Sequence, residues 1–352
     1  MNYNQELDKK NHERLIELCE QLPSFFDGFF NSISLRTTSL TQINYAYDFI
    51  LLFRFLRENH RDFKNFTDVK DIPVKLMDNI TVENLEAFQA WLSRDHATVQ
   101  YGKEYADGAE RLTIKRKLSS LRTLYKYLTA RNLINNNPTL LIDMPKIKEH
   151  EIIRMDPAEV ANLLDNVEFG LNLTKHEAVF HEKSGVRDLA IVTLLLGTGI
   201  RVSECVGIDT DSFNWDETSV LVHRKGGKEE RIYFGTEVEQ ALLAYKAIRD
   251  NMNPEPGHEK AFFISRNNVR ITPRSVERLV KKYSQTITTK HITPHKCRST
   301  YGTNLYRETG DVLLVSKQLG HSSPTVTAQH YTATDEDQKI SVRNTVKLRE
   351  DT

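Results

Sequence analysis

Six side chains in the second half of the sequence are of types that can act on an anion, and they follow one another in a fixed order. They are Arg201, Lys225, His295, Arg298, His321 and Tyr331. A guanidinium group is planar, always charged and able to bind two oxygens of one anion. An imidazole exchanges protons near neutral pH, and a phenol can serve as a nucleophile. The set therefore offers an anion clamp, proton carriers and a nucleophile.

The local sequence indicates how some of these side chains are positioned. Arg201 follows Gly199 at the junction of two expected helices, and Glu204 lies one turn later on the same face, where it could orient the guanidinium. His295 and Arg298 are three residues apart near a helix start, so we expect them to point the same way. A helix N-terminus also favours anions.

The remaining candidates lie at turns and helix ends. Lys225 is expected at the tip of a hairpin, and His321 follows Gly320, which suits the glycine position just beyond a helix. A short helix is expected to open at Pro324 and to present Tyr331 at its far end. Taken singly, each of these side chains is more often structural than functional, so the hypothesis depends on the whole set.

The set and its order resemble one family, the tyrosine site-specific recombinases. The arginine lies in GTGIRVSE, the lysine in RKGGKEER, the histidine–arginine pair in TPHKCRSTYGTNLY, the next histidine in LGHSS and the tyrosine in QHYTAT. These segments span residues 197 to 334, and TIKRKLSSLRTLYKYL in the first half is similar to the core-binding domain of the family. The chain length and the spacing of the segments most resemble those of a Xer recombinase that works without a second, paralogous recombinase.

The resemblance implies a role for each side chain. Tyr331 would attack the scissile DNA phosphate and form a 3′-phosphotyrosyl bond, while Arg201 and Arg298 would bind the non-bridging oxygens. Lys225 would protonate the leaving 5′-oxygen and His295 would assist proton transfer at the tyrosine. The remaining roles are a hydrogen bond from His321 to the phosphate and support of the cluster by Glu204. No cofactor and no metal ion is implied.

One feature departs from the family pattern, and the choice of the catalytic lysine stays open. The family usually places the tyrosine nine residues after the histidine of LGH, whereas His321 and Tyr331 are ten apart. The nucleophile segment would have to absorb the extra residue. Lys228 lies three residues after Lys225 and could reach the same place, so the sequence leaves two candidate lysines. It also does not fix the resting position of Tyr331.

Helical periodicity dominates the first half of the chain. We expect helices over residues 39–58, from Thr81 as N-cap with Asn84 three residues later, and over residues 112–134. The last of these carries an apolar stripe at i, i+4, i+7, i+11 and i+14, which predicts a core-facing surface. The stripe consists of Ile114, Leu118, Leu121, Tyr125 and Leu128.

The second half mixes helices with one hairpin. A polar connector begins at Pro145, and a helix is expected to begin with Asp156 as N-cap, Pro157 at its first position and Glu159 completing a capping box. We expect a surface loop over residues 166–185, a helix over 187–196 and strands over 218–223 and 230–234. The predicted fold class is mainly α with a small β-sheet. The resemblance further implies two domains. They are a helical core-binding (SAM-like) domain over residues 1–148 and a mixed α/β catalytic domain with a C-terminal tail helix over residues 149–352.

Charge is balanced overall but uneven along the chain. The 352 residues contain 48 Lys and Arg against 48 Asp and Glu, yet residues 111–131 contain seven basic and no acidic side chains. Residues 266–298 contain nine basic side chains and one acid. Two separated basic stretches suit a polyanion gripped from two sides, although such runs are often only solvated helix faces. The candidate DNA contacts are Lys115, Arg116, Arg122, Lys126, Arg270 and Arg274.

Other features limit the class of protein. No run of about 18 apolar residues predicts a membrane span, and the charged N-terminal segment does not resemble a signal peptide, so we expect a cytoplasmic protein. Cys19, Cys205 and Cys297 are too few and too scattered for a disulfide framework or a zinc site.

The resemblance also implies partners. It implies double-stranded DNA, four copies of the chain on two DNA sites, and strand exchange through a Holliday junction. A Xer-type enzyme would resolve chromosome dimers at a dif-like site with a DNA translocase of the FtsK type. The alternatives are an integrase of a mobile element acting at attachment sites, a type IB topoisomerase, or a helical DNA-binding regulator without catalysis. The tail after Tyr331 could dock on a neighbouring protomer or on its own domain.

Overall fold

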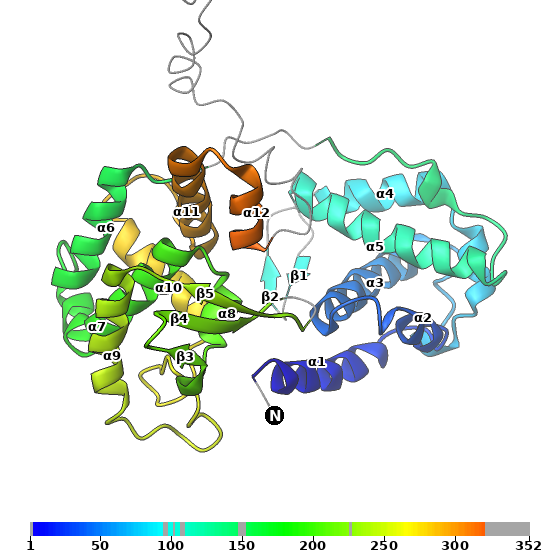
Figure 1. Cartoon of the computed structure of the whole chain (residues 1–352). Helices are drawn as coiled ribbons and strands as arrows, with labels where there is room; N and C mark the ends of the chain where they lie inside the picture. The colour runs from blue at the N-terminus through cyan, green and yellow to red at the C-terminus, as the bar shows by residue number, and fades with distance from the viewer. Residues whose placement is uncertain are drawn as a thin grey trace, which may run out of the picture. The chain divides into compact units, whose positions relative to one another are not determined.

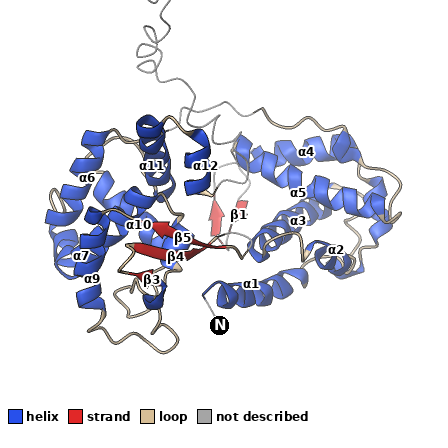
Figure 2. Cartoon of the chain, viewed as in Figure 1, coloured by secondary structure: helices blue, strands red, loops and turns tan. Residues whose placement is uncertain are grey.

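The computed structural model describes residues 3–93, 98–100, 103–105, 110–146, 153–224 and 227–320. The chain divides into two compact units, Met1–Glu149 and His150–Thr352. Helices make up most of both units, and the strands are short (Figures 1 and 2). The predicted fold class, mainly α with a small β-sheet, is confirmed. No helix among the described residues is long and apolar enough to cross a membrane.

The first unit is built mainly from helices. Its α-helices are α1 (Tyr3–Cys19), α2 (Phe26–Ile33), α3 (Ser39–Asn59), α4 (Val82–Ser93) and α5 (Arg111–Ala130). Short 3-10 helices are η1 (Val69–Asp71), η2 (Val74–Asn79) and η3 (Pro138–Leu140). Strands β1 (Thr98–Gln100) and β2 (Lys103–Tyr105) pair antiparallel.

The core of this unit confirms the predicted stripe on α5. All five stripe residues, Ile114, Leu118, Leu121, Tyr125 and Leu128, are buried against α3, α4 and an aromatic cluster on α2 and α3. Helix α4 begins as predicted: the Thr81 hydroxyl accepts from the Asn84 backbone nitrogen at 3.3 Å, and the Thr81 backbone nitrogen donates to Asn84 Oδ1 at 3.0 Å. Helix α5 ends at Ala130, four residues before the predicted end. Asn132 takes a left-handed φ of 54°, which stops the helix and which asparagine tolerates well.

The second unit combines seven α-helices, one 3-10 helix and one sheet among its described residues. The helices are α6 (Pro157–Phe169), α7 (Lys175–Thr198), α8 (Val202–Val206), α9 (Thr236–Arg249), α10 (Pro273–Ser284), α11 (Pro294–Thr309) and α12 (Val312–Leu319). After the 3-10 turn η4 (Thr210–Ser212) come β3 (Phe213–Asn214), β4 (Ser219–His223) and β5 (Glu229–Tyr233). They form an antiparallel sheet in the order β3-β4-β5, so the predicted hairpin is present. Helix α7 packs against α6, α9 and α11.

The loop predicted over residues 166–185 is wrong. Helix α6 continues to Phe169 and ends at Gly170, whose φ is 64°, and α7 already begins at Lys175. Thr174 and Glu177 form a capping box there, with the Thr174 nitrogen 2.9 Å from Glu177 Oε2. The first turns of α7 are largely solvent-exposed and lack an apolar stripe, so periodicity does not reveal them. At α6 the predicted capping box of Asp156 and Glu159 is confirmed.

Candidate active site

The junction between α7 and α8 holds the first predicted arginine. Gly199 ends α7 with a φ of 64°, and a Cβ there would lie 2.4 Å from Cδ1 of Tyr301, so both conformation and space require glycine. Arg201 is the N-cap of α8. Its backbone nitrogen donates to Glu204 Oε2 at 2.8 Å and its Nη1 to Glu204 Oε1 at 2.7 Å. The buried carboxylate therefore fixes both the main chain and the guanidinium of Arg201.

Arg298 comes from α11 and is buried, with 3% of its surface exposed. The helix begins at Pro294 behind Thr293, whose side chain caps the Lys296 nitrogen. The Arg298 guanidinium donates from Nη1 to the Gly199 carbonyl at 2.7 Å and from Nη2 to the Leu319 carbonyl. One side chain thus joins the end of α7 to the end of α12.

The C-terminal end of α12 is where the arginines meet. Arg201 Nη2 donates to the Gly320 carbonyl at 3.2 Å, beside the carbonyl of Leu319 that Arg298 holds. Gly320 ends the helix with a φ of 60°, as its sequence position predicts. The last carbonyls of a helix lack partners inside it and carry partial negative charge, which favours cations. His321 follows Gly320 in the chain. His321, Tyr331 and Lys225 lie outside the described residues.

His295 and Arg298 differ in exposure. His295 is exposed and lines a groove of about 650 Å³ between α8, α10 and the start of α11, whereas Arg298 is buried. The outer face of α10 supplies basic residues to this groove at i, i+4 and i+7: Arg274, Arg278 and Lys281. Sequence reasoning missed the last two, although this spacing places them on one helix face.

A buried network fixes α10 beneath that groove. Asp188 of α7 accepts from the Tyr283 hydroxyl at 3.0 Å and from Arg187 Nη2 at 2.7 Å, and Lys282 Nζ lies 3.5 Å away. Burial lowers the pKa of Lys282 and raises the pKa of the Tyr283 hydroxyl, and the adjacent carboxylate of Asp188 opposes the first shift and adds to the second. The polar partners of these groups are internal, so the network holds α10 in place.

The other nucleophile candidates near the arginines are protonated at neutral pH. Burial raises the pKa of the Cys297 thiol to about 12 and also raises the pKa of the Cys205 thiol. Burial raises the pKa of the Tyr301 hydroxyl, and a hydrogen bond with Gln318 opposes this shift. These three groups are poor nucleophiles in this setting.

The six predicted DNA contacts separate into two groups. Arg116 binds Asp48 with both terminal nitrogens at 2.7 Å, and Arg122 donates to the carbonyls of Thr139 and Ile142 at 3.0 and 3.1 Å. Arg270 donates to the carbonyls of Val206 and Ile208, at 3.0 and 3.1 Å, and pairs with Asp209. These three guanidiniums hold the fold together, so we propose only the other three residues of the set as DNA contacts. They are Lys115, Lys126 and Arg274, all exposed, although Arg274 also pairs with Glu277 of the same helix at 3.1 Å.

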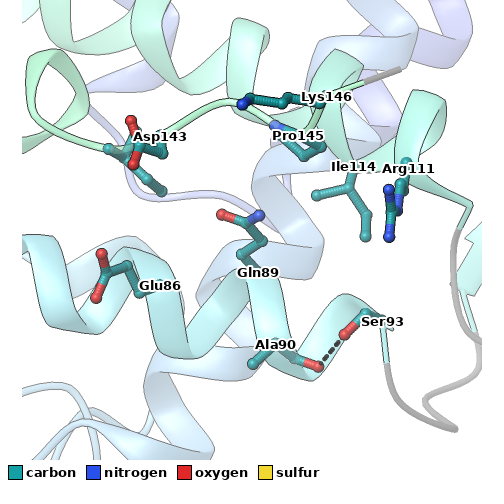
Figure 3. Close-up of a pocket in the computed structure, with 10 residues that line it drawn as sticks. Glu86, Gln89, Ala90, Ser93, Arg111, Ile114, Asp143, Pro145 and Lys146 are labelled. Atoms are coloured by element: carbon teal, nitrogen blue, oxygen red, sulfur yellow. Dashed lines mark hydrogen bonds between the residues drawn. The ribbon is translucent and has the colours of Figure 1, made fainter. Parts of the chain in front are cut away.

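The first unit contains a separate hollow of about 580 Å³ between α4, the start of α5 and residues 142–146. Figure 3 shows the carboxylates of Glu86 and Asp143 toward one end and Arg111 toward the other. The one hydrogen bond drawn there joins the Ser93 hydroxyl to the Ala90 carbonyl at 2.8 Å. Its charged groups, which include Lys146, are spread along the hollow rather than convergent. Within the described ranges, no group of three or more His, Cys, Asp and Glu side chains could hold a metal ion.

Comparison with known proteins defines the class. Residues 154–338 match the model of the phage integrase family. In fold, 87% of the chain superposes on the XerH recombinase in a post-cleavage complex with palindromic difH, covering 80% of that chain, with a TM-score of 0.64 and 16% identity. The Tn1549 transposon integrase with transposon right-end DNA gives a TM-score of 0.64 at 18% identity, covering 92% of this chain and 97% of that one. The chain therefore belongs to the phage integrase family, whose members are tyrosine recombinases that cleave and rejoin DNA.

Sequence similarity places the chain more finely within that class. It is 30% identical to the tyrosine recombinase XerS of Streptococcus agalactiae serotype III (strain NEM316), over 93% of this chain and 96% of that protein. It is 31% identical to XerS of Lactococcus lactis subsp. cremoris (strain SK11), over 85% of this chain and 91% of that protein. The chain is thus a tyrosine recombinase of the Xer type.

Proposed function

We propose that this recombinase resolves chromosome dimers at a dif-like DNA site, through a 3′-phosphotyrosyl intermediate and a Holliday junction. The observation that carries the chemistry is the meeting of Arg201 and Arg298 at the end of α12, one residue before His321. Similarity to XerS over most of the chain supports the dif-like site as the target. A DNA translocase of the FtsK type is the proposed partner.

In the proposed reaction, the Tyr331 oxygen attacks the scissile phosphorus and the bond from phosphorus to the 5′-oxygen breaks. The phenolic proton leaves through His295, and Lys225 gives a proton to the departing 5′-oxygen. Arg201 and Arg298 bind the non-bridging oxygens, with Glu204 keeping Arg201 in place. Loss of one such clamp would cost about 3 kcal/mol of barrier, by analogy with oxyanion donors. The covalent bond conserves the energy of the broken linkage. The 5′-hydroxyl of a second strand then attacks the phosphotyrosine, which forms a new phosphodiester and releases the Tyr331 oxygen.

At the level of assembly, we propose four protomers on two DNA sites that exchange two strands at a time. The first unit would grip one side of the duplex as the core-binding domain, and the second unit would supply the other side and the active site. The proposed contacts are Lys115 and Lys126 on α5 and the basic face of α10. The tail after Tyr331 would couple active sites if it docks on a neighbouring protomer rather than on its own domain.

The test is covalent capture on a dif-like duplex nicked so that the 5′-hydroxyl fragment diffuses away. The wild-type protein should form a protein–DNA adduct, and Tyr331→Phe should form none. Tyr233→Phe is the matched control, because Tyr233 is 61% exposed on β5, and it should form the adduct like the wild type. A peptide map of the adduct names the nucleophile and tests the ten-residue spacing from His321. An adduct that persists in Tyr331→Phe contradicts the assignment.

The same assay separates the alternatives. A DNA-binding regulator without catalysis would bind the duplex and leave no adduct with any variant. Competition between a dif-like duplex and an attachment-site duplex distinguishes chromosome dimer resolution from integration. Relaxation of supercoiled DNA without sequence preference would instead indicate topoisomerase activity.

A further inference from the structure

Arg224 is a buried arginine that the proposed catalytic set does not include. It directly follows β4, and its backbone nitrogen donates to the Lys228 carbonyl at 2.7 Å, which closes the β4–β5 hairpin. Only 7% of its surface is exposed. Burying a guanidinium is costly unless its partners compensate, so its surroundings require an explanation.

One partner of Arg224 lies at the helix end that Arg201 and Arg298 bind, and the other lies on β5. Its Nη2 donates to the Gln318 carbonyl at 2.7 Å, and its Nε forms an ion pair with Glu230 Oε2 at 2.8 Å that lacks the geometry of a hydrogen bond. Its Nη1 is buried and makes no hydrogen bond to any of the described residues. That nitrogen lies against Gly320, where a Cβ would be only 1.4 Å away.

Three arginines from three elements thus hold three consecutive carbonyls. Arg224 from the hairpin takes the carbonyl of residue 318, Arg298 from α11 takes 319 and Arg201 from α8 takes 320. A cation at a helix C-terminus is favourable because the last carbonyls carry partial negative charge. Any shift of this end would therefore move a partner of both clamp arginines.

We propose that Arg224 is a positioning residue of the active site: it ties the end of α12 to the β4–β5 hairpin and so keeps Arg201 and Arg298 oriented for the phosphate. The inference rests on the proposed function of the two clamp arginines. It also gives Gly320 a second role, since the absence of a side chain leaves room for the Arg224 guanidinium. A misplacement of about 1 Å can lower a rate about 100-fold, so a small movement of the helix end is enough.

The first experiment compares Arg224→Met with Arg249→Met. Arg249 is the matched control, because it is 5% exposed in the same unit and donates to the backbone carbonyls of Ala261 and Glu259 at 2.9 and 2.6 Å. Single-turnover adduct formation on the nicked duplex should fall about 10- to 100-fold in Arg224→Met, with unchanged DNA affinity. The Arg249→Met rate, measured below the melting temperature of both variants, should stay near wild type. Equal losses in both variants, or a loss of DNA affinity in place of rate, overturn the proposal.

A measurement independent of catalysis accompanies it. Amide hydrogen exchange at the end of α12, including the Gly320 amide that donates to Lys317 at 2.8 Å, should speed up in Arg224→Met and not in Arg249→Met. Unchanged exchange there overturns the proposal. Absence of an adduct with the wild-type protein would instead count against the proposed function, so the two failures are distinguishable.

The second experiment uses two glycines with the same backbone conformation. Gly310 and Gly320 end α11 and α12 with φ of 65° and 60°, but a Cβ on Gly310 meets nothing within 4 Å. Gly310→Ala therefore measures backbone strain alone, whereas Gly320→Ala should also displace Arg224 and lower the adduct rate further. In an Arg224→Ala background, Gly320→Ala should cost no more than Gly310→Ala. Equal effects of the two glycine changes, or strictly additive effects with Arg224→Ala, contradict the role of Arg224.

Discussion

At the residue scale, one buried carboxylate holds Arg201 at two points, while the Gly320 carbonyl holds it at a third. Glu204 uses one oxygen for the Arg201 backbone and the other for its guanidinium. A charge-assisted pair with two fixed contacts loses little further entropy when a phosphate arrives. The Arg201 side chain is 36% exposed, which leaves part of it available to an incoming anion. A carboxylate three residues after an arginine is a local pattern, and the sequence alone predicts it.

The choice between Lys225 and Lys228 is a second question at this scale. The sequence leaves both open, and Lys228 is exposed with its carbonyl closing the hairpin turn. We predict that Lys225→Ala loses adduct formation by about 100- to 10,000-fold on an ordinary phosphodiester, the usual worth of a general acid. A 5′-bridging phosphorothiolate should restore it, because a thiolate leaves without protonation. Lys228→Ala should change neither rate appreciably. If the phosphorothiolate substrate restored Lys228→Ala and not Lys225→Ala, Lys228 would be the general acid.

At the element scale, a buried charge cluster joins α3 to α5. Asp48 is 1% exposed and accepts from both terminal nitrogens of Arg116 and, at 3.0 Å, from Nζ of Lys117. Lys117 is itself 4% exposed. Removing the shared carboxylate leaves a buried ammonium without its counter-charge, which is far more costly than losing a surface pair.

We therefore predict that Asp48→Asn destabilises the first unit by about 3–5 kcal/mol. Glu17→Gln, which breaks the exposed Arg14–Glu17 pair, should cost about 0.5 kcal/mol or less. Urea denaturation of the full chain, followed by fluorescence of Trp91 in a Trp215→Phe background, reports this unit separately because the chain has two tryptophans, one in each unit. A loss below about 1 kcal/mol in Asp48→Asn would show that the cluster is not coupled to the stability of the unit.

The elements also show which parts of the structure a sequence can predict. The α5 stripe and the Asp156–Glu159 box depend on residues within a few turns, so spacing alone predicts them. The pairing of Asp48 with Arg116 joins residues 68 apart, and that of Arg224 with Gln318 joins residues 94 apart. Such pairs arise from tertiary packing, and nothing in the local pattern distinguishes these arginines from surface cations. The first turns of α7 are local structure, yet their polarity pattern does not indicate a helix. Only the capping box of Thr174 and Glu177 does.

At the scale of the whole molecule, a net charge of zero conceals separated charge. The chain has equal numbers of basic and acidic residues, yet the outer face of α10 presents Arg274, Arg278 and Lys281 around one groove. The helix is held by the internal Asp188 network, so these side chains project from a fixed support. DNA binding by such a face releases counterions from the phosphate backbone and weakens steeply with salt.

This leads to a prediction for the binding of the whole molecule to DNA. Replacing Arg278 by Gln should weaken binding by a similar factor on dif-like and unrelated duplexes, because a phosphate contact carries no base information. The slope of log K against log salt should become less steep by about 1, as expected when one phosphate contact is lost. Lys260→Gln is the control, because it removes the same charge from an exposed turn outside the groove, and its slope should equal that of the wild type. Fluorescence anisotropy titrations at several salt concentrations measure both slopes. If the slope were unchanged and binding weakened only on the dif-like duplex, Arg278 would contact a base. If Arg278→Gln and Lys260→Gln had equal effects, only the net charge of the protein would matter.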